Sequence, residues 1–77
     1  MPHNVNANWH TEETGQVYTV TVSTPSSRVL AVVNVEVPLQ PGHRLADRVG
    51  EEKVREIEEQ ARGIARAVAD GVQPRPA

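Results

Sequence analysis

The chain lacks cysteine, and it has few of the large side chains that usually fill a protein core. Without a thiol it has neither a disulfide nor a thiolate metal site. Its 77 residues include one tryptophan, one tyrosine and no phenylalanine. A domain of this length buries only about 60–65% of the surface that its unfolded chain exposes, so its stability is marginal. We therefore expect a second subunit to supply additional burial.

Strong charge of one sign and long apolar runs are also missing. The formal net charge is −2 at pH 7, whereas proteins that bind nucleic acid or anionic membranes are normally basic. No apolar run approaches the ~18 residues of a membrane-spanning helix, and the N-terminus lacks the basic-then-apolar order of a signal peptide. We predict a cytoplasmic protein with no membrane partner. Its preference for arginine over lysine fits the codon usage of a GC-rich bacterium.

The first half of the chain is rich in valine and threonine, and its apolar and polar residues alternate. This period of two is typical of half-buried strands. It predicts three strands, separated by the turn-forming segments EETG and TPSS, at residues 4–11, 16–23 and 28–37.

The pairing of these strands follows from the length of the turns. Four-residue loops would pair Thr11 with Gln16 and Ser23 with Arg28. The large apolar side chains of all three strands then share one face, and Trp9 lies opposite Tyr18. Because a slip of one residue would scatter them over both faces, we predict an antiparallel meander with this register.

The second half of the chain has the pattern of a helix. Apolar residues recur at intervals of three and four, which places them on one stripe: Val54, Ile57, Ala61, Ile64 and Val68. Leu45 and Val49 fall off this stripe, so we expect the helix to begin near Gly50 after a break, although a start near Arg44 stays open. The sequence predicts an α+β fold of order β-β-β-α, with one domain over residues 1–71 and a disordered tail over 72–77.

The predicted sheet has an inner face against the helix and an outer face. On the outer face the first two strands are polar, but the third strand places Leu30 and Val32 there. With their neighbours they form the predicted interaction surface, which consists of Leu30, Val32, Thr19, Thr21 and Asn34. This surface permits two arrangements. Either the edge of the third strand pairs with a second subunit into a six-stranded sheet, or the outer face packs against a subunit or partner.

No residue pattern of an enzyme or a metal site occurs. His3, His10 and His43 lack the spacing that presents two ligands on one helix face. The serines near the second turn lack the nucleophile-elbow pattern, and the glycines form no phosphate-binding loop. We therefore predict no catalytic residue, no metal site, no cofactor and no enzymatic activity. A minimal metal- or small-molecule-binding protein around His10 is a third option.

An arginine row supports an alternative function. Arg48, Arg55 and Arg62 recur every seven residues, with Arg66 nearby, so on one helix they share a face. The β-β-β-α order resembles the C-terminal part of double-stranded-RNA-binding domains in topology. In that family the last helix presents lysines near its start to phosphates, whereas this helix begins GEEKVREIEE. The alternative is a nucleic-acid-associated, antitoxin-like regulator.

The function that these features favour is a small non-enzymatic protein-interaction or regulatory module. We expect it to act as a homodimer and to bind a further protein that the sequence does not identify. The expectation of a homodimer rests on the thin core and on the apolar residues of the outer face.

Overall fold

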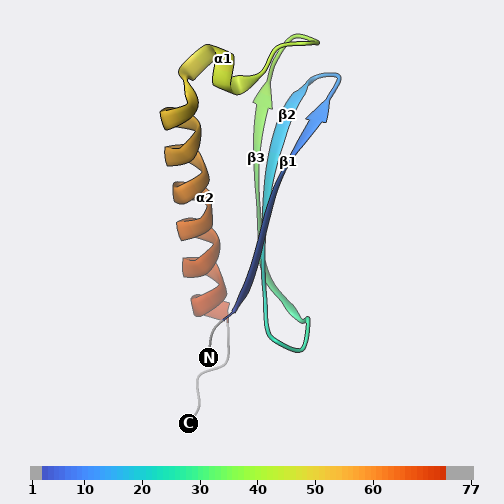
Figure 1. Ribbon diagram of the computed structural model, residues 1–77. Coiled ribbons are helices and arrows are strands. Elements are labelled where there is room, and N and C mark those ends of the chain that lie inside the picture. Colours follow the sequence, from blue (N-terminus) through green and yellow to red (C-terminus); the bar gives the residue numbers. More distant parts are fainter. Residues whose placement is uncertain (1–2, 73–77) are drawn as a thin grey trace.

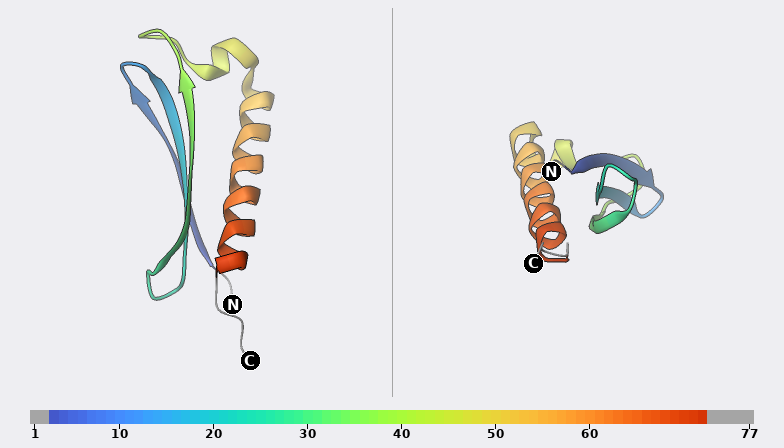
Figure 2. Two further views of the ribbon diagram at one scale, coloured as in Figure 1. Left: turned by 180° about the vertical axis from the view of Figure 1, so that it is seen from behind. Right: turned by 90° about the horizontal axis from the view of Figure 1, so that it is seen from below.

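The computed structural model describes residues 3–72 of the chain. Its elements, in chain order, are β1 (Asn4–Glu12), β2 (Gly15–Ser23), β3 (Val29–Pro38), α1 (Leu45–Val49) and α2 (Glu51–Val72). The three strands form one layer and α2 forms a second layer along one face of the sheet (Figures 1 and 2). The predicted α+β class and the β-β-β-α order are confirmed. Of the predicted tail, Val72 ends α2, and the remainder lies outside the described residues.

The first hairpin has the predicted register. Thr11 pairs with Gln16, and Trp9 pairs with Tyr18. The two rings are in contact, with centroids 4.9 Å apart. The ladder extends one pair further than expected, to Glu12 and Gly15, so the turn between them has two residues. Gly15 has a φ of +148°, and an added Cβ would collide with the carbonyl oxygen of Val37. This close approach of β2 and β3 requires glycine.

The second hairpin differs from the predicted register, because its loop is tighter than expected. Thr24 N–H donates to the Arg28 carbonyl oxygen at 2.9 Å, and Ser27 N–H donates to the Thr24 carbonyl oxygen at 2.9 Å. Ser27 takes a left-handed φ of 70°. The result is a three-residue loop closed by a residue in this conformation, one of the common hairpin geometries.

A bulge follows this loop and changes which residues face the core. Ser23 pairs with Val29, but the next pair is Val22 with Ala31, so Leu30 is an extra residue. The register of β3 is therefore shifted by two from the prediction beyond the bulge, and a shift of two keeps Ala31 and its alternate neighbours on the inner face. At the bulge the orientation reverses. Val29 is 56% exposed, and Leu30 packs against the core.

The predicted break before the long helix is confirmed. α1 and α2 are separated at Gly50, whose φ of +88° is a left-handed conformation that glycine adopts readily. Leu45 of α1 is buried, whereas Val49 is exposed. The backbone N–H of Leu45 donates to Gln16 Oε1 at 2.8 Å, which ties α1 to the start of β2.

The face of α2 that packs on the sheet differs from the predicted stripe. The buried residues are Ala61, Ala65 and Ala69, at intervals of four. Ile64 and Val68, which the pattern assigned to the core, are 57% and 45% exposed. The alanines pack against the inner face of the sheet, in a core whose other buried members are Tyr18, Val20, Val22 and Ala31. Small side chains let the helix lie close to these larger ones, and this packing turns the isoleucine and valine of α2 to one side.

Candidate interaction surface

An uncharged strip of α2 lies in solvent beside the buried alanines. Between Ile57 and Val72 the helix carries several charged residues, but none of them falls on this strip. At about 100° per residue, the strip comprises Ile57, Gln60, Ile64, Val68 and Gly71, which we call the α2 flank. Ile57 is half-buried and the other members are exposed. A large exposed apolar strip on a charged helix is a mark of an interaction site.

The side of the helix on which the α2 flank lies follows from two hydrogen bonds. Trp9 Nε1 on β1 donates to Glu58 Oε2 at 2.6 Å, and an Arg62 guanidinium nitrogen donates to Tyr18 Oη on β2 at 3.4 Å. Glu58 and Arg62 lie on the opposite side of the alanine line from Ile64. Since Glu58 reaches β1 and Arg62 reaches β2, the α2 flank on the opposite side of the helix lies on the β3 side, and α2 packs over β2 and β3.

β3 is an edge strand with a free row of backbone groups. Within residues 3–72 it pairs with β2 alone. Leu39 N–H donates to the Thr14 carbonyl oxygen at 3.0 Å. Because hydrogen-bonded and non-hydrogen-bonded pairs alternate along an antiparallel ladder, the odd-numbered residues of β3 bond to β2. The N–H and C=O groups of Val32, Asn34 and Glu36 therefore point outward, and we call this row the β3 edge.

The structure brings four of the five predicted surface residues together on the outer face. Thr19 pairs with Asn34 and Thr21 pairs with Val32, and Thr19 Oγ1 donates to Asn34 Oδ1 at 2.8 Å. Val32 is 53% exposed. The predicted outward orientation of Leu30 is wrong, because the bulge turns it toward the core.

The α2 flank was not predicted as a surface, because Ile64 and Val68 fitted the expected core stripe. A second stripe was visible in the sequence, since alanines stand at 61, 65 and 69. Two stripes at neighbouring angles on one helix indicate that the apolar side is wider than one sheet contact requires. That width could have pointed to a second contact.

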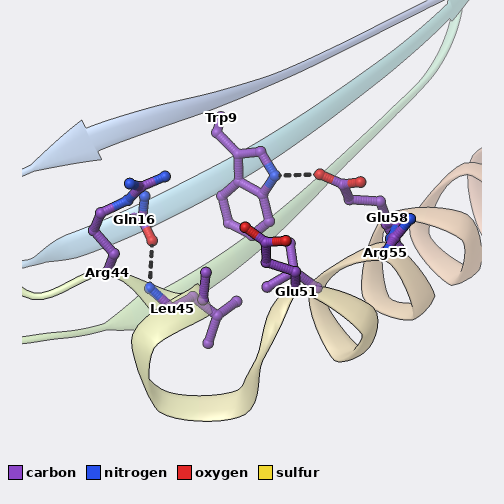
Figure 3. A pocket seen from close by; sticks show the side chains of 9 residues that line it. Trp9, Gln16, Arg44, Leu45, Glu51, Arg55 and Glu58 are labelled. Carbon is purple, nitrogen blue, oxygen red and sulfur yellow. Dashed lines mark hydrogen bonds between the residues drawn. The ribbon is translucent and has the colours of Figure 1, made fainter.

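A small open pocket lies near α1 and the start of α2, between these two helices and strands β1 and β2 (Figure 3). Its volume is about 430 Å³. Trp9 forms one wall and is held by its hydrogen bond to Glu58. The charged groups at its rim are of both signs, two arginines and two carboxylates: Arg44, Arg55, Glu51 and Glu58. This hydrogen bond joins β1 to α2, so Trp9 and Glu58 have a structural role.

The predicted arginine row is not continuous. Arg48 belongs to α1, and the break at Gly50 separates it from the other three, so the assumption of one shared helix face is wrong for Arg48. Arg55, Arg62 and Arg66 lie on the side of α2 away from the α2 flank. Arg62 is half-buried and its guanidinium contacts Tyr18.

The third option concerned His10. His10 is exposed on β1 and His43 is exposed in the segment before α1. Across residues 3–72, no three His, Cys, Asp or Glu side chains are grouped closely enough to hold a metal ion. Among the helices of this same part of the chain, neither has the length and apolar character needed to cross a membrane.

Comparison with known proteins found no matching family model, no matching curated protein and no matching solved structure.

Proposed function

We propose that this protein is a small non-enzymatic protein-interaction module that acts as a homodimer. The α2 flank is the observation that supports the proposal most directly. It leaves Ile64 and Val68 about half exposed beside the unpaired edge of β3. Full burial of such a side chain contributes about 1.5–3 kcal/mol, so covering the exposed half of each yields roughly 1 kcal/mol per residue.

The composition of the core supports the same proposal. The largest side chains that are fully buried are Val20 and Val22, and the helix contributes only alanines to the buried cluster. A chain of this size with so small a core gains stability when a second subunit covers apolar surface. The isoleucine and valines that would enlarge the core are present, but they stand at its margin, where a second subunit can reach them.

Light scattering during size-exclusion chromatography tests the proposal, and Ile64→Glu provides the informative variant. We expect the wild-type chain to have the mass of a dimer at tens of micromolar. Ile64→Glu should shift it to the monomer mass, since the added carboxylate would have to be desolvated in the interface.

Gly63→Glu is the matched control. It adds the same side chain one residue away, on a different side of α2, where a Cβ meets no atom within 4 Å. It should leave the mass unchanged. A monomer mass for the wild-type chain at these concentrations would refute the homodimer. Equal effects of the two variants would show that the α2 flank is not the surface used.

A further inference from the structure

We propose that the partner of the α2 flank and the β3 edge is a second copy of the chain, paired strand to strand. In this arrangement β3 lies antiparallel to β3 of the second copy, and the two-fold axis passes through Asn34. The product is a continuous six-stranded sheet with two α2 helices side by side on one face. This inference rests on the proposed homodimer and specifies its geometry.

The free backbone groups of β3 restrict the register. Only Val32, Asn34 and Glu36 present their N–H and C=O groups outward. A two-fold axis must therefore pass through a residue and not between two residues. Only then do residues whose N–H and C=O groups point away from β2 pair with residues of the same kind. An axis at Asn34 pairs residues 31–37 with 37–31 of the second copy. This is the longest ladder that avoids both the bulge at Leu30 and the missing N–H of Pro38.

The side-chain pairs that an axis at Asn34 creates are compatible with this register. On the outer face Asn34 meets Asn34 of the second copy, and Val32 meets Glu36. On the inner face Val33 meets Val35 of the second copy, so the apolar layer continues across the axis. An axis at Glu36 would place two carboxylates directly opposite each other, which destabilises a strand pair. An axis at Val32 would draw the bulge into the ladder.

The helices fit the same axis. α2 packs over both β2 and β3. A helix midway between these two strands would stand two strand spacings of about 4.8 Å from its symmetry mate, or roughly 10 Å. Packed helices stand about 8–10 Å apart. Arg62 contacts Tyr18, which pairs with Val35. Since α2 runs antiparallel to β3 (Figure 1), Ile64 lies near the level of Asn34, and the two copies of Ile64 approach the axis together.

A second copy suits this surface because its α2 flank is uncharged, like the α2 flank that it would contact. The α2 flank of each copy carries no charge from Ile57 to Gly71, so contact between the two flanks leaves no ion without water or a counter-charge. Each copy also brings the row of outward N–H and C=O groups that the other needs. Pairing with a second copy thus covers the apolar α2 flank and gives the free N–H and C=O groups of the β3 edge their hydrogen-bond partners.

Single cysteines test the strand pairing, because the chain has no cysteine of its own. Asn34→Cys places a thiol at the axis. Residues that form a hydrogen-bonded antiparallel pair have Cα atoms about 5.5 Å apart, within the range that a disulfide spans. Asn8→Cys is the matched control. Asn8, Thr19 and Asn34 form one row across the outer face, so Asn8 offers the same exposed asparagine on the opposite edge.

After mild oxidation, we expect most of the Asn34→Cys protein to run as a covalent dimer on a non-reducing gel, while Asn8→Cys stays monomeric. A dimer mass by light scattering without a crosslink at Asn34 would overturn this arrangement and leave the homodimer standing. A monomer mass would refute both. A crosslink at Asn8 instead would move the interface to β1.

Val32→Pro supplies a second readout that needs no thiol. In the isolated chain the N–H of Val32 points outward, so proline removes a hydrogen bond that only the second copy would accept. We expect a folded protein, by circular dichroism, with at least a tenfold weaker self-association. A folded protein with unchanged association would contradict the strand pairing.

Discussion

Enlarging Ala65 is the sharpest test of how α2 packs on the sheet. Ala65 is completely buried in the cluster that contains Tyr18 and Val20. Leucine at this position adds three carbon atoms where the helix and the sheet are in contact, so α2 must move away from the sheet. Overpacking of this kind costs about 1–3 kcal/mol. The total stability of a chain of this size is only about 4–12 kcal/mol, so the loss is a substantial part of it.

Thermal unfolding followed by circular dichroism measures this loss. For a domain of 60–100 residues, 1 kcal/mol shifts Tm by about 4–8 °C, so Ala65→Leu should lower Tm by roughly 4–24 °C. Ala67→Leu is the matched control, because Ala67 is exposed on the same helix. Its effect should stay within about 0.5 kcal/mol. Both proteins must be compared at one concentration, because self-association makes Tm depend on concentration. Equal shifts for the two variants, or a higher Tm for Ala65→Leu, would refute the observed packing and favour the Ile64 and Val68 stripe.

Three further predictions address other parts of the molecule. Gly15→Ala should lower the midpoint of urea unfolding, because its Cβ collides with the Val37 carbonyl and its φ is left-handed; a cost below about 0.5 kcal/mol would show that β2 and β3 separate there easily. Trp9→Phe should cost about 1 kcal/mol, since it removes the donor to the half-buried Glu58 carboxylate and keeps an aromatic ring against Tyr18; a full loss of folding would mean that Trp9 contributes far more than this bond. In mobility-shift assays at low salt we expect no retardation of DNA or RNA, because acidic residues surround the arginines of α2; a shift that weakens as salt is added would favour the nucleic-acid alternative.

The first hairpin was predictable because its information is local. Alternation on β1 and β2 restricts the register to steps of two, and a glycine-containing turn sets the offset. The second hairpin was not predictable to the residue. TPSS permits more than one loop, and the chosen loop depends on Ser27 adopting a left-handed φ, which sequence patterns do not indicate for serine. The bulge that follows is the reason why Leu30 and Val29 exchanged faces.

The candidate surface was only partly predictable for a related reason. Four residues were placed on the outer face correctly, because a register shift of two residues leaves every side chain on the same face of the sheet: Thr19, Thr21, Val32 and Asn34. The α2 flank was not recognised as a surface, because hydrophobicity alone ranks isoleucine above alanine as a core residue. That ranking takes no account of how closely the helix approaches a sheet whose inner face already carries Tyr18 and Val20.

The sequence by itself determined the order of the elements, the antiparallel meander, the break at Gly50 and the thinness of the core, because each depends on residues that are close together in the chain or on composition. Only the tertiary structure decided which stripe of α2 is buried. The helix carries an alanine line and an isoleucine–valine line at neighbouring angles, and both satisfy the helical period. Close packing against the sheet selected the alanines. The larger side chains were left beside the free edge of β3, where we propose that a second copy covers them.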